Sequence, residues 1–364
     1  MNSALLAESY SDFLFTKPPL TFSSIHKMNN SISFLKHKYP NNYEMQKKTI
    51  LSLTNDGLEG INISVLLEFY RAEGDLEELA KLTSFLMESE NRTDRVWAEL
   101  YNLLLGFYNY EMYPSQVIDK VMRIQTYSDE MRVFALLVHL HALMRDNMLG
   151  PVEKISKHVL LLIEEIDNDY LRHSYKLQLS QFLSSAWLLL NRIGECRAIS
   201  MEMIDLGLHS LYPFCYCNFY HVMAQSYQFT DYDEAVLWLD KAQERLLALT
   251  TDWVEPRRQN IRNTRYFIEN YWRKNLCCIP EDPSEAAHYR IVRGEISEAI
   301  AILDGLYQKN GYFTPFQEFY YAIATKDGKR MKFAKEKFAW NSNHLFFHLF
   351  SKETLNIYNF VEEK

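Results

Sequence analysis

The sequence predicts an all-α protein, a right-handed superhelix built from stacked pairs of helices. Residues Ser284–Leu306 carry two apolar stripes at helical spacing on either side of Gly294, so two helices should fold back against each other there. One such pair cannot bury both of its apolar faces, and further pairs are therefore expected. No stretch alternates apolar and polar residues as a half-buried strand would. Equivalent core positions recur at steps of about 38 to 41 residues: Leu79, Val117, Ile155, Cys196 and Ala235.

Each repeat is expected to be a helix, a short turn and a second helix, which is the pattern of tetratricopeptide (TPR) units. Gly74 and Gly194 stand at the turns of two repeats, as Gly294 does in the last one. Weaker copies begin near Pro114 and Gly150. The steps are longer than the consensus TPR length of about 34 residues, so the units should be looser than standard ones.

The other helices can be assigned in chain order. Residues 1–20 hold a short apolar cluster that ends at two prolines, residues 21–330 should form the TPR-like solenoid, and 331–364 should form C-terminal helices. Helices are also expected over four segments: 22–40, Tyr43–Leu53, Ile61–Glu73 and Glu255–Arg273.

Composition limits the possible classes of function. Of 364 residues, 48% are hydrophobic and 24% charged, and the net charge is −8, so the surface as a whole does not favour nucleic acid. The N-terminus lacks the basic and apolar regions of a signal peptide, and the apolar runs are too short to cross a bilayer. Five cysteines without a disulfide-like pattern fit a reducing compartment. We expect a cytoplasmic protein without membrane contact.

The C-terminal helices are unusually apolar for the end of a solenoid, which normally needs a polar cap. We expect a second copy of the chain to cover them across a two-fold axis, so that residues 331–364 form a homodimer. The alternative is that they close the end of their own solenoid. The residues concerned are Leu345, Phe346, Leu349, Phe350 and Ile357.

No constellation of residues predicts catalysis, a metal site or a cofactor. His344 and His348 lie one helical turn apart, but no acidic residue or third ligand accompanies them. Cys217 and His221 share a helical face without the second pair that a zinc site needs. The chain also has no Gly-rich phosphate loop and no nucleophile elbow. These features indicate a binding protein rather than an enzyme.

Three features could contact a ligand. The first is the arginine-rich helix at 257–265, which is otherwise a solvated face. The second is Glu285, which could meet a ligand cation or simply complement the dipole of its own helix. The third is a group of polar residues on otherwise apolar helices, able to bond a peptide backbone or neighbouring helices: Gln178, Ser184, Ser185, Asn218 and Gln225.

Four segments carry, in this order and spacing, a resemblance to a known family: FSSIHKMNNSISFLKHKYP at 22–40, NRIGECRAIS at 191–200, AQSYQFTDYDEA at 224–235, and YWRKN with SEAAHYRIVRGEISEAIAILDGL at 271–306. The chain resembles the arbitrium receptors (AimR) of temperate Bacillus phages, members of the RRNPP class of peptide-sensing regulators. The resemblance implies a cytoplasmic, dimeric, TPR-like receptor in a bacterial host cell that binds a hexapeptide pheromone in its concave groove. It also implies that the unliganded receptor binds an operator and promotes lysis, while the peptide releases it and favours lysogeny.

The resemblance further implies peptide-binding residues. Glu285 matches the acidic residue that meets the arginine of the peptide. Most of the other matching positions carry changed residues, which implies either a different peptide or a lost peptide site. Two asparagines of the family fall near Ser185 and at Gln225, and an arginine of the family falls near Phe214. The acidic and the aromatic contact of the C-terminal region fall near Asn343 and Leu345.

The beginning of the chain departs from the family. Family members start with a helix-turn-helix that needs some fifty residues before the solenoid, whereas about twenty precede the helix at Phe22 here. We therefore expect residues 1–20 to be a remnant of a truncated DNA-binding region, without specific operator binding. The alternative function is a TPR-like protein–protein adaptor that binds no peptide pheromone.

Overall fold

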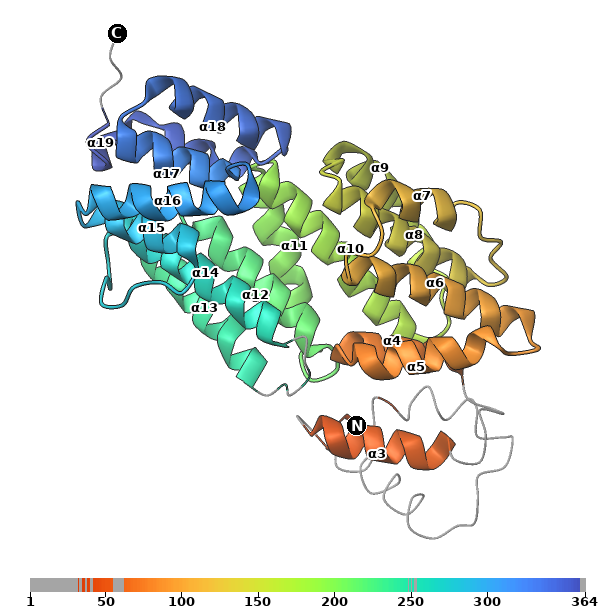
Figure 1. Ribbon diagram of the computed structural model, residues 1–364. Coiled ribbons are helices and arrows are strands. Elements are labelled where there is room, and N and C mark those ends of the chain that lie inside the picture. Colours follow the sequence, from red (N-terminus) through yellow and green to blue (C-terminus); the bar gives the residue numbers. More distant parts are fainter. Residues whose placement is uncertain are drawn as a thin grey trace.

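Helices form every regular element among the residues that the computed structural model describes, and they follow one another in pairs joined by short turns (Figure 1). The described residues are 32, 35, 36, 38, 39, 42–54, 62–247, 249, 251 and 254–360. Over this part of the chain the all-α prediction is confirmed. The expected remnant of a helix-turn-helix at 1–20 lies outside the described residues.

The helices begin and end close to where the sequence pattern placed them. The successive pairs are α4 with α5, α6 with α7, α8 with α9, α10 with α11, α12 with α13, α15 with α16, and α17 with α18, and α14 is a single long helix before the last two pairs. Their bounds are α3 Tyr43–Thr54, α4 Ile63–Glu73, α5 Leu76–Met87, α6 Arg92–Tyr108, α7 Pro114–Val121, α8 Asp129–Arg145, α9 Leu149–Glu164, α10 Asp169–Leu189, α11 Ile193–Asp205, α12 Pro213–Tyr227, α13 Tyr232–Leu247, α14 Val254–Trp272, α15 Pro283–Val292, α16 Ile296–Asn310, α17 Pro315–Thr325, α18 Gly328–Trp340, the 3-10 helix η2 His344–Phe350, and α19 Lys352–Ile357.

Residues with positive φ make most of the turns between paired helices. Gly74 (φ 72°) separates α4 from α5, and Gly294 (φ 81°) separates α15 from α16, because glycine enters the left-handed region without a Cβ clash. Gly194 does not have this role. It lies in the first turn of α11, and Asn191 (φ 59°) makes the turn instead, a conformation that asparagine tolerates.

The recurring core positions lie in the second helix of successive pairs. Ile155 of α9 is half-buried, whereas the neighbouring Ser156 is 1% exposed and points into the core. The predicted register is therefore correct in four repeats and shifted by one residue in α9. The four fully buried positions are Leu79, Val117, Cys196 and Ala235.

The apolar C-terminal segment packs onto its own chain. Leu345 and Leu349 of η2 are 2% and 0% exposed. The ring of Phe346 meets Phe316 edge-on at 4.6 Å and stacks on Phe338 at 5.5 Å. Leu345, Phe346 and Leu349 thus close the end of their own solenoid, which was the alternative expected from the sequence. Phe350 and Ile357 are half-buried, and a homodimer through this segment stays a prediction.

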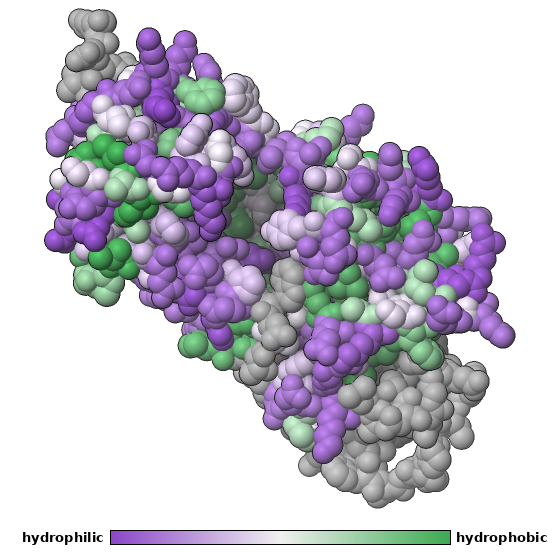
Figure 2. Space-filling model, in the orientation of Figure 1, coloured by the Kyte–Doolittle hydropathy of each residue, from purple (hydrophilic) through white to green (hydrophobic). Residues whose placement is uncertain are grey.

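Both ends of the solenoid return toward its middle. Helix α10 contacts α4 from the beginning of the described chain and η2 from its end. At the first contact region Thr251 Oγ1 donates to the carbonyl of Glu73 (3.0 Å), and at the second Ser342 Oγ donates to the carbonyl of Asn147 (3.4 Å). The chain therefore curls around an interior, and Figure 2 shows a hollow between the part with α6–α9 and the part with α15–α18. None of the described helices has the length and apolar character needed to cross a membrane.

Candidate functional site

Helix α12 presents one narrow stripe that its neighbours leave uncovered. Its other faces pack against α4, α10, α11 and α13, and most of its residues are buried. Four residues of α12 are half-buried. Three of them, Phe214, Asn218 and Gln225, share one face with His221 (8% exposed), and the fourth, Tyr227, is the last residue of the helix. Because the surrounding helices cover the rest of α12, this stripe borders the interior of the superhelix.

The stripe continues onto neighbouring helices. His221 Nε2 lies 2.8 Å from Thr264 Oγ1 of α14, and this hydrogen bond joins the inward faces of α12 and α14. Phe182 of α10 contacts the ring of His141 of α8 at a centroid distance of 5.4 Å. Gln181 Nε2 of α10 donates to the carbonyl of Cys215 of α12 at 2.9 Å, which joins the two pairs of helices. We call these adjoining faces of α8, α10, α12 and α14 the inner groove.

Several polar side chains on the inner groove have no partner. The side chains of Ser185, Gln225 and Arg257 are half-buried and make no hydrogen bond or ion pair with any residue that the structure describes. The Oδ1 atom of Asn218 is buried, again without a partner. Buried polar groups are normally hydrogen-bonded, because an unmade bond costs about 1–3 kcal/mol. The inner groove therefore holds donors and acceptors available to a ligand.

Nearby arginines act on two histidines of the inner groove. Burial, together with the smaller effect of the charges of Arg71, Arg145 and Arg257, lowers the pKa of His141 to about 4. Burial and the charge of Arg257 lower the pKa of His221 to about 3. Both imidazoles are therefore neutral at pH 7, and the charges that act on them are cationic.

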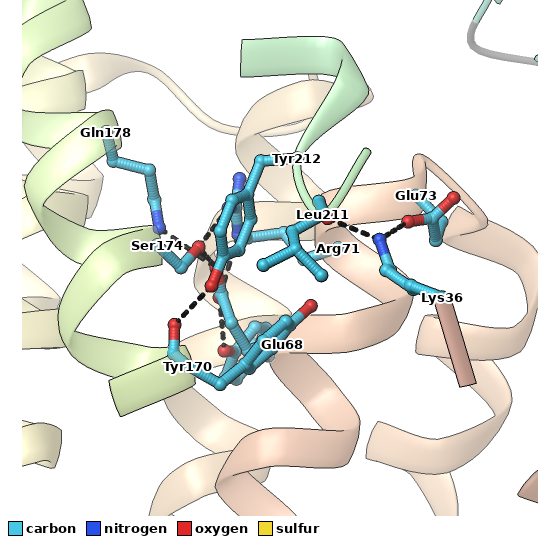
Figure 3. Close-up of polar contacts among 10 residues, drawn as sticks. Lys36, Glu68, Arg71, Glu73, Tyr170, Ser174, Gln178, Leu211 and Tyr212 are labelled. Atoms are coloured by element: carbon cyan, nitrogen blue, oxygen red, sulfur yellow. Dashed lines mark hydrogen bonds and ion pairs between the residues drawn. The ribbon is translucent and has the colours of Figure 1, made fainter. Parts of the chain in front are cut away.

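One wall of the interior is fixed by a buried network around Glu68, which is 0% exposed (Figure 3). Arg71 donates to both carboxylate oxygens, at 2.8 and 2.6 Å. Tyr101 Oη donates at 3.0 Å, Gln178 Nε2 at 3.1 Å, and the Ser174 hydroxyl also donates to Glu68. These bonds join α4, α6 and α10, so the network fixes how the first helices meet the middle of the solenoid.

A second ion pair lies at the C-terminal end of α4. Lys36, which is 1% exposed, forms an ion pair with Glu73 and donates to the carbonyl of Leu211 (Figure 3). Leu211 lies in the turn just before α12. This pair connects the segment before α3 to both α4 and the start of the helix that lines the inner groove.

The structure brings together three of the six residues predicted to bind a peptide. Ser185 on α10 and both Phe214 and Gln225 on α12 lie along the inner groove. Asn343 lies at the start of η2, where its buried Oδ1 has no partner, and Leu345 is buried among the apolar residues of the C-terminal segment. Whether these residues touch a ligand stays a prediction for each of them.

Glu285 lies in a different environment from the one the sequence suggested. It is 8% exposed; it accepts a hydrogen bond from Tyr320 Oη (2.9 Å) and lies 3.3 Å from His288 Nδ1. Asn270 Nδ2 approaches it at 3.4 Å, and His288 Nε2 in turn lies 2.7 Å from Tyr358 Oη. Both carboxylate oxygens thus have partners within the chain. A ligand that used Glu285 would have to replace one of these partners.

Sequence reasoning did not single out Arg257 among the arginines of its helix. The signal is present in the pattern, because Arg257, Ile261, Thr264 and Ile268 share one face at helical spacing. Two of these are buried and one bonds His221, so the face points inward. Arg258, Arg262 and Arg265 lie elsewhere around the helix and pair with acidic residues.

Comparison with known proteins agrees with this architecture. A family described as AimR transcriptional regulator-like matches residues 42–355. The AimR transcriptional regulator of Bacillus phage SPbeta is 22% identical over 293 residues, which cover 78% of this chain and 72% of that protein. An uncharacterised protein of Bacillus anthracis, pXO2-35, is 26% identical over 197 residues, or 54% of this chain and 73% of that protein.

Solved structures show the same fold. The structure of phAimR-Ligand superposes with a TM-score of 0.68 at 20% identity and covers 80% of this chain and 87% of that chain. The structure of SeMet-phAimR has a TM-score of 0.59 at 20% identity and covers 80% and 78%. The prediction of a helical-repeat solenoid is therefore confirmed.

Proposed function

Because this chain belongs to the AimR-like family of transcriptional regulators, we propose that it is a regulator whose state is set by a short peptide bound in the inner groove. The observation that carries this proposal is the set of unpartnered polar side chains on the inner groove: Ser185, Asn218, Gln225 and Arg257. A solved relative of the same fold is a ligand complex, which supports a ligand-binding role.

An extended peptide suits these groups chemically. Each peptide unit offers one N–H and one C=O, and a side-chain amide can satisfy both. Asn218 and Gln225 are separated by about 10 Å along α12, since each helical residue rises about 1.5 Å. That distance corresponds to about three residues of an extended chain. A peptide of about six residues would therefore run along the groove past both amides and reach the neighbouring helices.

The regulatory output that we propose is the choice between phage lysis and lysogeny in a bacterial host cell. Peptide binding between α10, α12 and α14 would shift these helices against α4, which contacts both α10 and α12. The Lys36–Glu73 pair lies where α4 meets the start of α12, and it connects these helices to the segment before α3. The output would pass through DNA or through a protein partner.

Peptide selection tests this function. Purified full-length chain is incubated with a pool of synthetic hexapeptides, the captured peptides are identified by mass spectrometry, and their affinities are measured by calorimetry. We expect discrete hexapeptides to bind, and Gln225→Ala to weaken them. Gln243→Ala is the matched control, because Gln243 is exposed on α13. Binding of no hexapeptide would contradict the proposal and favour a TPR-like adaptor for proteins.

A further inference from the structure

Arg257 is a half-buried cation without an anion. No carboxylate, carbonyl or hydroxyl of the described chain accepts a hydrogen bond from its guanidinium group. An arginine at this depth normally has a partner, because removing its charge from water is costly unless an opposite charge or several acceptors compensate. The structure therefore leaves one strong set of donors unused.

The position of Arg257 directs it into the inner groove. It shares its face of α14 with Thr264, which bonds His221 of α12. Its charge also acts on Cys217 of α12 and on His141 of α8, two helices that do not adjoin it in the chain. The bond between Thr264 and His221 places this face of α14 against α12. The same stripe of α12 carries Asn218, whose buried Oδ1 has no partner.

The other interior arginines are already engaged. Arg71 is neutralised by Glu68. Arg145 donates to the carbonyl of Phe107 at 2.6 Å, and its guanidinium carbon lies 3.9 Å from the ring centroid of Tyr110. Neither has a free fork of donors directed at a ligand. Of the three described arginines whose charges act on His141, Arg257 is therefore the one without a partner in the described chain.

The unused charge in the groove is thus positive, whereas the acid that the family resemblance assigns to a ligand, Glu285, is occupied within the chain. We propose that the ligand of the inner groove presents a carboxylate to Arg257, with the amide oxygen of Asn218 accepting an N–H of the same ligand. A guanidinium fork binds a carboxylate through two parallel hydrogen bonds, which fixes orientation as well as charge. This inference rests on the proposed function. The carboxylate is either the C-terminus of a peptide or an Asp or Glu side chain.

The test uses three matched pools of synthetic hexapeptides: free C-termini, amidated C-termini, and free C-termini without Asp or Glu. Each pool is presented to wild type, to Arg257→Gln and to Arg258→Gln. Arg258 is the control because it lies one residue away on α14 and pairs with Glu255 instead. We expect wild type and Arg258→Gln to capture peptides that carry a carboxylate, and affinity to fall about ten- to a hundredfold in Arg257→Gln.

The pools identify the source of the carboxylate. Loss of capture from the amidated pool alone assigns it to the C-terminus, and loss from the pool without acids alone assigns it to a side chain. The inference is overturned if Arg257→Gln binds the captured peptides as tightly as wild type, or if those peptides of the amidated pool that lack Asp and Glu bind equally well. Capture of no peptide from any pool by wild type overturns the proposed function itself, and this inference with it.

Discussion

The Glu68 network offers a quantitative test of how the solenoid is held together. Glu68 is fully buried and is the acceptor for Arg71, Tyr101, Ser174 and Gln178. Glu68→Gln preserves the shape of the side chain but removes the charge that neutralises Arg71. Breaking a buried ion pair by removing one partner costs about 3–5 kcal/mol, because the remaining charge stays buried. A glutamine amide oxygen can still accept some of these hydrogen bonds, so we expect the free energy of unfolding to fall by the lower value of this range, about 3 kcal/mol.

Equilibrium unfolding in urea measures this loss, with Glu77→Gln as control. Glu77 pairs with Lys81, but its side chain is 71% exposed, and exposed pairs contribute about 0–1 kcal/mol. The expected result is a large fall in the unfolding free energy for Glu68→Gln and almost none for Glu77→Gln. A loss below about 1 kcal/mol for Glu68→Gln would refute the view that this network joins α4 to α10.

Four further outcomes follow from the same contacts. Gln225→Ala should weaken the binding of a captured hexapeptide about two- to tenfold in calorimetry, since a neutral hydrogen bond contributes about 0.5–1.5 kcal/mol, while Gln243→Ala should leave the affinity unchanged. Equal affinities of Gln225→Ala and wild type would exclude Gln225 as a contact. Lys36→Met should lower the unfolding free energy by about 3 kcal/mol in urea, because Glu73 is left buried and unpaired, and a loss within experimental error would contradict the buried pair. His141 binds protons more weakly in the folded chain than in the unfolded one, so its contribution to stability should be fully present above pH 6.5 and decline as pH falls toward about 4, by at most about 3 kcal/mol. His141→Gln should flatten this decline when urea unfolding is measured at a series of pH values. An unchanged pH dependence would refute the assignment. Glu285→Ala should cost about 1–3 kcal/mol of stability, because Tyr320 and His288 lose an acceptor, and thermal unfolding that matches wild type would show that these bonds are dispensable.

Local pattern was enough to predict most of the helices. Apolar spacing placed α15 and α16, and the repeat steps located the buried positions in four second helices. The errors were also local. Ile155 and Ser156 are adjacent in α9, and periodicity alone cannot choose between neighbouring registers when one candidate is polar. Gly194 suggested a turn, but Asn191 adopts the left-handed conformation three residues earlier.

The interior contacts could not be predicted because they join distant parts of the chain. Glu68 and Gln178 are 110 residues apart, and Lys36 and Leu211 are 175 apart. No local pattern pairs such residues, and the curl of the superhelix decides which faces meet. Glu285 is a similar example. Its position in the first turn of a helix could be predicted from the sequence, but its buried partner Tyr320 could not, because the packing of the helices brings the two together. Polar groups without partners, such as Asn218 Oδ1, can be recognised once the packing is known.

The structure of the full chain in complex with a captured hexapeptide tests the central claim most directly. The account predicts an extended peptide between α10, α12 and α14, with its backbone bonded to the amides of Asn218 and Gln225 and a carboxylate on Arg257. A peptide bound on the outer face of the second helices, with these three side chains still free, would contradict it.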